Sequence, residues 1–154
     1  MTHPQPSTTI SLHIQRVLNS HRHWIGRELL KRIGGPEAQA AALDAAPFVL
    51  VSHGTEADPI LNYGNRLALE LWELDFASLT QMPSRLTAEA LHRDERAQFM
   101  AQVKRDGFVT GYQGIRISNS GKRFRIEEAL IWNVLDEQSI VCGQAAAFSK
   151  WTRL

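Results

Sequence analysis

The last third of the chain carries the pattern that most restricts its fold. Residues 108–117 are typical of a strand, and the next four residues, Ser118 to Gly121, form a strong turn signal. Apolar and polar residues then alternate over residues 124–134, the chain turns again at Asp136 to Ser139, and residues 140–148 make a final strand. Three strands joined by two short turns predict an antiparallel meander.

A long amphipathic helix is predicted ahead of this region. Apolar residues recur at helical spacing from Ile10 to Ile33, and Gly34, Gly35 and Pro36 are expected to end the helix. Residues 1–9, which include two prolines, are expected to be disordered, and an alanine-rich helical turn or two should follow over residues 37–46. Residues 10–46 therefore form an N-terminal helical segment.

Short strands and short helices are predicted between residues 47 and 107. A buried strand is expected over residues 48–51 and a shorter one over residues 59–63. Three helices should follow: one with Asn65 as its N-cap, one with Asp75 as its N-cap, and, after a loop at residues 80–87, one from Thr87 to Gly107.

Length and charge limit the class of protein. A chain of 154 residues fits one domain of ordinary size, and its net charge of +1 gives no overall field for nucleic acid or membranes. The first 33 residues hold five basic residues against one glutamate, a surplus of four positive charges, so the rest carries −3. One cysteine excludes an internal disulfide. No signal peptide or membrane span is evident, so a soluble, cytoplasmic protein is expected.

The order of elements and several short motifs resemble a PAS-like family, the MEKHLA domain. The segment ILNYGNRLALELW resembles the second strand and first helix of PAS domains. The segments MPSRLTAE, GYQGIRISNSGKRFRI, WNVLDE and GQAAAFSKW look like the bacterial stand-alone form of the MEKHLA domain. The resemblance implies an α+β fold: a PAS-like five-stranded antiparallel sheet over residues 47–154, with short helices on one face and an extra N-terminal helix. It also implies a sensory or ligand-binding role.

Plant members of the family place the module behind homeodomain–leucine zipper regulators. No homeodomain or heptad zipper is evident here, so DNA binding does not carry over with the resemblance.

The cofactors of better known PAS domains find little support in these residues. Flavin adduct chemistry needs a cysteine in the loop at residues 82–86, which has none, and the strand positions facing a flavin edge, residues 125–128, hold no asparagine. A haem-binding PAS domain presents a histidine from its long helix, where Asp94 rather than His92 occupies the matching position. The ligand is therefore unknown, with flavin adduct and haem argued against.

Catalytic and metal-binding motifs are also missing. The six histidines show no metal-binding spacing, and Cys142 lies within a predicted strand as an inert thiol. No phosphate-binding glycine loop or nucleophile elbow occurs. We expect no enzymatic activity and no metal.

Glu128 is the one carboxylate that strand alternation directs inward. Ile126, Glu128 and Trp132 share one face of their strand, so an inward apolar face takes Glu128 with it. A buried carboxylate needs a partner, and Arg116 and Arg85 are candidates. A stabilising Glu128–Arg116 pair is favoured over a ligand contact.

Three functions follow from these expectations. The leading one is a ligand-binding sensor that acts through a protein partner in trans. The second is a homodimerising docking module with a filled core, and the third, least favoured, is a nucleic-acid accessory protein that uses the basic first 33 residues. Candidate pocket residues are Tyr63, Trp72, Arg85, Phe99, Tyr112, Arg116, Glu128, Trp132 and Gln144; candidate dimer contacts are Leu12, Trp24 and Leu30.

Overall fold

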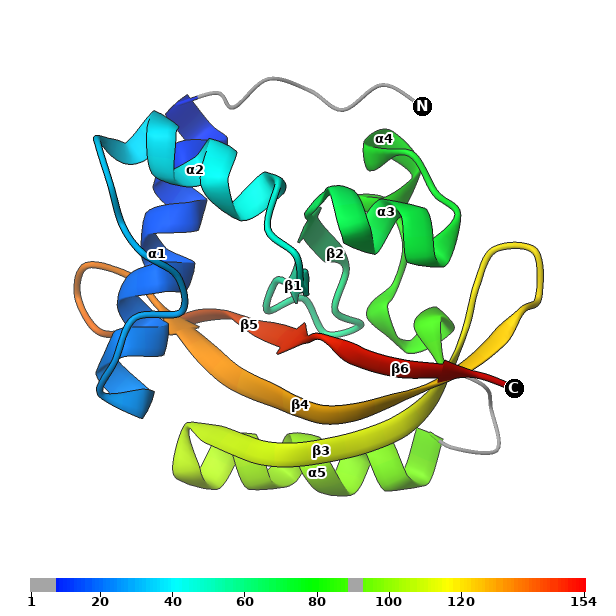
Figure 1. Cartoon of the computed structure of the whole chain (residues 1–154). Helices are drawn as coiled ribbons and strands as arrows, with labels where there is room; N and C mark the ends of the chain where they lie inside the picture. Colours follow the sequence, from blue (N-terminus) through cyan, green and yellow to red (C-terminus); the bar gives the residue numbers. More distant parts are fainter. Residues whose placement is uncertain (1–7, 89–92) are drawn as a thin grey trace.

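The computed structural model describes residues 8–88 and 93–154, which form an antiparallel sheet with helices on both of its faces (Figure 1). The strands are β1 (Val49–His53), β2 (Leu61–Gly64), β3 (Phe108–Ile117), β4 (Arg123–Leu135), β5 (Val141–Phe148) and β6 (Lys150–Arg153). The helices are α1 (Thr8–Ile25), α2 (Pro36–Asp44), α3 (Arg66–Trp72), α4 (Phe76–Leu79), the 3-10 turn η1 (Ser84–Thr87) and α5 (Arg93–Asp106).

The sheet has the strand order β2-β1-β5-β4-β3, and every pairing in it is antiparallel. The predicted meander is present, because β3, β4 and β5 are neighbours in sequence order. The short β6 was not predicted. It pairs with residues 124–127 of β4, whereas β5 pairs with residues 130–135, so β5 and β6 line successive parts of the same strand. The predicted α+β fold is confirmed, with one short strand beyond the expected five.

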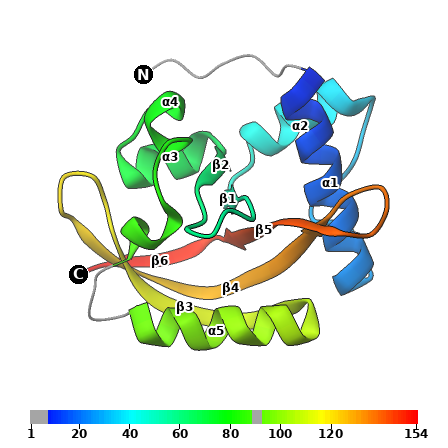
Figure 2. The same cartoon turned by 180° about the vertical axis from the view of Figure 1, so that it is seen from behind.

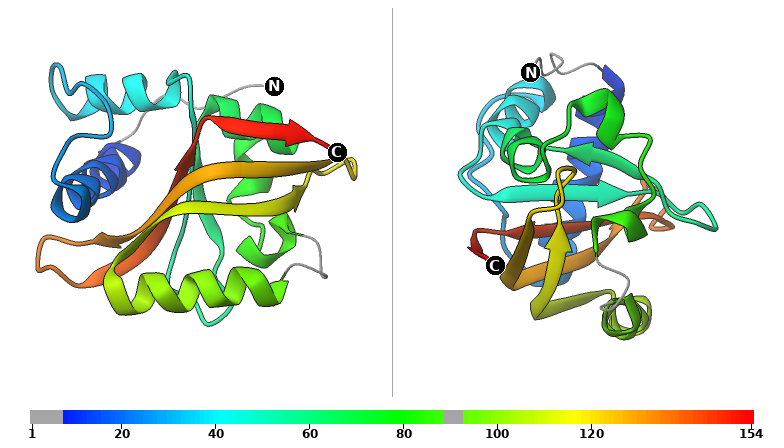
Figure 3. Two further views of the ribbon diagram at one scale, coloured as in Figure 1. Left: turned by 60° about the horizontal axis from the view of Figure 1, so that its bottom comes forward. Right: turned by 90° about the vertical axis from the view of Figure 1, so that its right-hand side faces the viewer.

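Two hydrophobic cores lie on opposite faces of this sheet. The inner core packs α3, α4 and α5 against one face and includes Trp72, Val103 and Phe124. The outer core packs α1 and α2 against the other face and includes Val17 and Trp132. The left-hand view of Figure 3 shows strands of the sheet between α1 and α2 on one side and α3 and α4 on the other, and Figure 2 shows the same two groups of helices apart from behind. The N-terminal segment thus covers a sheet face that would otherwise expose its apolar side chains.

The first helix is shorter at its C-terminal end than predicted. It begins at Thr8, so Thr8 and Thr9 are helical rather than disordered, and it ends at Ile25 instead of Ile33. Gly26 has a φ of 84°, and its N–H donates to the carbonyl of Arg22 over 2.9 Å, which is a left-handed C-terminal cap. The expected terminator, Gly34, lies beyond an irregular segment that leads to α2.

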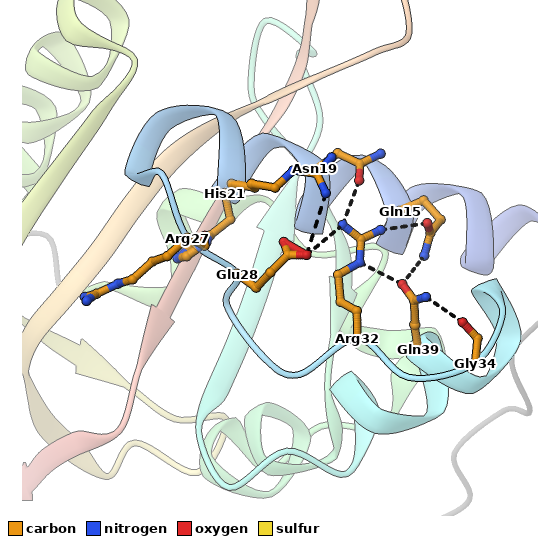
Figure 4. Close-up of polar contacts among 9 residues, drawn as sticks. Gln15, Asn19, His21, Arg27, Glu28, Arg32, Gly34 and Gln39 are labelled. Carbon is orange, nitrogen blue, oxygen red and sulfur yellow. Dashed lines mark hydrogen bonds and ion pairs between the residues drawn. The ribbon is translucent and has the colours of Figure 1, made fainter.

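A polar network around Arg32 fixes that irregular segment to α1 and α2 (Figure 4). The Arg32 guanidinium donates to Gln15 and Asn19 of α1 and to Gln39 of α2, each over 2.8 Å. Glu28 lies 3.5 Å from the same guanidinium. Since one side chain joins two helices and the connection between them, residues 8–44 behave as one layer of the domain.

Two of the three residues expected at a dimer interface pack within the chain instead. The indole Nε1 of Trp24 donates to the carbonyl of Asn133 over 2.9 Å, and a Cβ atom placed on Gly107 would lie 2.4 Å from the indole ring. Leu30 is half-buried against the outer core. Leu12 alone is exposed, with 46% of its surface accessible. Trp24 and Leu30 thus make intramolecular contacts while remaining partly exposed, and a homodimer stays a prediction.

Between residues 65 and 107, the predicted helix boundaries hold at three places and fail at one. Asn65 and Asp75 cap α3 and α4 by accepting from the amides of Ala68 and Ser78, and Gly107, with a φ of 90°, follows the last residue of α5. Thr87 does not open the long helix. It ends η1, and its neighbour Ala88 forms an isolated bridge with Arg116 of β3.

Candidate functional site

A small internal cavity of about 60 Å³ lies between the inner face of the sheet and the elements that cover it. Its wall combines apolar side chains such as Ile126 and Phe148 with polar ones from β1, β3, β5 and η1. Of the nine predicted pocket residues, four line it: Trp72, Tyr112, Arg116 and Gln144.

Glu128 is the clearest error among the other five. Its side chain is 69% exposed and pairs with Lys150 over 2.8 Å on the surface. Between the pairs Tyr112–Ala129 and Gly114–Ile126, β4 holds one more residue than β3, and Glu128 has a φ of 53°. This is a β-bulge, which shifts the inward-facing set by one residue, so Ala129 is buried where alternation placed Glu128. The predicted pair with Arg116 does not form.

The same bulge explains why Trp132 is absent from the cavity. Beyond Glu128, the even-numbered residues of β4 face the outer core, where the Trp132 indole donates to the carbonyl of Val17 over 3.2 Å. The His21 ring meets this indole edge-on, with 5.1 Å between ring centroids. Tyr63 is also buried in the outer core, and burial raises the pKa of its hydroxyl far above the usual range.

Arg85 and Phe99 lie near the site without lining the cavity. Arg85 is exposed and pairs with Asp58 over 3.1 Å. Phe99 packs edge-on against the Tyr112 ring, with 4.4 Å between centroids, and so supports the cavity wall from behind. The shift in strand register thus explains Glu128 and Trp132, whereas Tyr63, Arg85 and Phe99 pack or pair outside the cavity.

Arg116 and Tyr112 form the charged part of the wall. Arg116 is 6% exposed and Tyr112 is 1% exposed. The Arg116 Nη2 group donates to the Tyr112 hydroxyl oxygen, and Nη1 donates to the carbonyl of Ile115 over 3.1 Å. Gly114 leaves room for this pair, because a Cβ atom there would lie 2.8 Å from the Tyr112 oxygen and 3.0 Å from Arg116 Nη1.

Trp72 also lines the cavity, and its side chain carries a buried polar group. The residue is 4% exposed, and its indole Nε1 is buried without a hydrogen-bond partner among the described residues. A buried N–H without an acceptor costs about 1–3 kcal/mol. Such a donor in a cavity wall is suited to a ligand that brings an acceptor.

Three side chains separate the cavity from an open groove of about 560 Å³. His53, Met100 and Gln144 line both spaces. The His53 Nε2 atom lies 3.3 Å from Gln144 Oε1, and the Gln144 amide reaches Asn133 over 3.5 Å. The groove and the cavity therefore adjoin each other at these side chains.

Sequence reasoning missed His53, Ser84, Thr87 and Met100, all of which line the cavity. Ser84 and Thr87 lie in η1, where the Thr87 hydroxyl donates to the Ser84 carbonyl over 2.8 Å. Both residues lie in the motif MPSRLTAE, from which only Arg85 was predicted to line the pocket.

Other chemistry finds no assembled site in the described residues. Residues 8–88 and 93–154 contain no group of three side chains arranged to hold a metal ion. Cys142 is half-buried beside the outer core, where burial raises the pKa of its thiol. His92 lies outside the described residues. None of the helices described here is long and apolar enough to cross a bilayer.

Comparison with known proteins agrees with this architecture. The profile of the family described as MEKHLA domain matches residues 11–153. The homeobox-leucine zipper protein ATHB-15 of Arabidopsis thaliana is 23% identical over 137 residues, which cover 88% of this chain and 16% of that protein. The chain thus spans about one sixth of that relative's length.

Solved structures share the fold at low identity. A PAS domain from Colwellia psychrerythraea superposes with a TM-score of 0.62 at 15% identity, covering 72% of this chain and 92% of that one. A light-oxygen-voltage domain studied with a flavin analogue gives a TM-score of 0.60 at 13% identity, covering 76% and 84% of the two chains.

Proposed function

The chain belongs to the MEKHLA domain family, and we propose that it is a PAS-like sensory module that binds a small ligand and acts through a partner protein. The partly open cavity between the sheet and its inner helices is the observation that carries this proposal. A space walled by apolar side chains with a few convergent polar groups is the usual form of a ligand site. The groove beside His53 and Gln144 supplies a route in.

The flavin of the light-oxygen-voltage neighbour does not fit these residues. Pockets for ligands of that size have volumes of roughly 300–1,000 Å³, whereas the cavity here holds about 60 Å³. The chain's cysteine, Cys142, packs beside the outer core on the opposite side of the sheet from the cavity. The proposed ligand is therefore much smaller than flavin.

The proposed module has no catalytic role of its own, and its output passes to another protein. A suitable contact region is the β4–β5 hairpin, where Ile140 is 62% exposed and Val141 is 46% exposed. Val141 also lines the groove that leads to the cavity, so ligand entry and partner contact would share one surface.

A docking module without a ligand is the second candidate, because the cavity is small enough for side chains to close.

A role as a nucleic-acid accessory protein has less support. Arg16 pairs with Glu137 over 2.7 Å, and Arg22 and Arg32 both lie within 4 Å of Glu28. The Glu137 pair compensates one of the four surplus positive charges of the first 33 residues, because Glu28 is already counted in that surplus.

Native mass spectrometry of the chain purified under non-denaturing conditions tests the proposal. We expect a mass excess from a small compound that is retained when metabolites are present at about millimolar concentration and that disappears on denaturation. A mass equal to the bare chain, together with no effect of any small metabolite on thermal unfolding, would favour the docking module instead.

A further inference from the structure

We propose that the ligand is a small carboxylate anion held by Arg116, Tyr112 and Trp72, an assignment that rests on the ligand-binding function proposed above. The polar groups of these three residues are hydrogen-bond donors with N–H or O–H protons that lack an acceptor among the described residues. This bias in the wall, rather than its shape, identifies the chemical class of the ligand.

The charge of Arg116 is the first argument. A guanidinium carries five N–H donors and is always protonated in proteins. Among residues 8–88 and 93–154, the acceptors that it reaches are the Tyr112 hydroxyl and the Ile115 carbonyl, and both are neutral. Among the described residues no carboxylate lies within ion-pair distance of it, and the cavity lining holds no Asp or Glu. A cation that is 6% exposed needs an anionic partner, which a ligand can provide.

Tyr112 and Trp72 each add a hydrogen-bond donor that lacks an acceptor in the described part of the chain. Since the Tyr112 oxygen accepts from Arg116, its own O–H proton points elsewhere, and no acceptor for it is found among the described residues. The Trp72 indole N–H is buried and also lacks an acceptor there. A cation and two neutral donors around one cavity suit the two oxygens of a carboxylate, which are acceptors in every direction.

Cavity size restricts the anion further. One water molecule needs about 10–15 Å³ of cavity volume, so the 60 Å³ here hold about four to six non-hydrogen atoms. Acetate, propionate and pyruvate fall in that range, whereas an aromatic acid or a nucleotide does not. Ligands with so few atoms bind with dissociation constants between about micromolar and millimolar values.

Titration of the intact chain, followed by amide chemical shifts, tests the assignment. The probes are acetate, propionate, pyruvate and inorganic phosphate, with acetamide as the uncharged analogue of acetate. We expect the carboxylates to shift resonances of the cavity lining, with binding about 10- to 100-fold tighter than that of acetamide. Arg116→Met should abolish this preference, and Trp72→Phe should weaken acetate binding about 3- to 10-fold.

Arg85→Met is the matched control, because Arg85 is a nearby arginine that pairs with Asp58 outside the cavity. It should bind acetate as the wild type does. Equal binding of acetate and acetamide by the wild type, or unchanged acetate binding by Arg116→Met, would overturn the carboxylate assignment and leave the ligand-binding function standing. If no probe shifts the lining resonances and native mass spectrometry finds no retained compound, the proposed function fails as well.

Discussion

Replacing His13 should remove much of the acid sensitivity of this fold. The His13 ring on α1 lies 2.9 Å from the Ser52 hydroxyl, which in turn donates to Asn62 over 2.6 Å. Burial first, and the nearby Arg16 guanidinium second, lower the pKa of His13 to about 4, from an ordinary value of 6.5. A histidine whose pKa is lower in the folded chain resists protonation there, so acid favours the unfolded chain.

The stability contributed by this group is complete above about pH 6.5 and is lost as the pH falls toward 4. With these two pKa values, the free energy of unfolding should fall by about 2 kcal/mol between pH 7 and pH 5. His21 shifts in the same direction, so some acid sensitivity remains without His13. Hydrogen bonds from Ser118 and Ser120 lower the pKa of Glu73 to about 2. Carboxylates of this kind lose their contribution to the free energy of unfolding as the pH falls below about 4.5.

Urea unfolding of the wild type and of His13→Gln at pH 7 and pH 5 measures the effect. The variant keeps a side-chain N–H near Ser52. Its free energy of unfolding should fall by about 2 kcal/mol less than that of the wild type between the two pH values. His23→Gln is the control, because His23 is an exposed histidine of the same helix. Equal pH dependence of His13→Gln and the wild type would refute the argument from burial.

Three further substitutions test the register, the outer core and the Arg116 pair. Glu128→Gly should hold or raise the urea midpoint, since glycine adopts the positive φ at the bulge without strain; a lower midpoint would contradict the exposed placement. Trp24→Ala should lower stability by about 2–4 kcal/mol in thermal unfolding while the mass from light scattering stays that of the wild type; a change of assembly instead would restore Trp24 as a dimer contact. Arg116→Met alone should lower the free energy of unfolding in urea by about 1–3 kcal/mol, because it leaves the buried Tyr112 hydroxyl without its donor. Arg116→Met combined with Tyr112→Phe should change it by less than about 1 kcal/mol. A double variant less stable than the single one would contradict this argument.

Local signals in the sequence predicted the elements that local chemistry determines. Asn65 caps α3 because its short side chain accepts from the amide of Ala68, and the same residue type and position are readable without a structure. The meander of β3 to β5 followed from turn residues and alternation. These features depend on residues close together in the sequence, so their prediction agrees with the structure.

The site was harder to predict because it depends on two features that sequence does not display. The bulge at Glu128 inserts one residue into β4 and exchanges the faces of everything after it, including Trp132. The sheet is also buried on both faces, so apolar residues of β4 do not identify the inner one. Gly26, which ends α1, stands between Ile25 and a further run of apolar residues that resembles a continuing helix.

Closing the cavity from within tests the central claim most directly. Ala146 of β5 is a half-buried lining residue, and Ala146→Leu would fill the space with three additional carbon atoms. Amide spectra of the wild type and of this variant should be recorded with charged and uncharged metabolites of up to about six non-hydrogen atoms. We predict that at least one compound shifts the resonances of Tyr112 and Gln144 in the wild type and that none does so in a folded Ala146→Leu chain. Identical spectra of the wild type with and without every compound at millimolar concentration would contradict a ligand-binding role for this cavity.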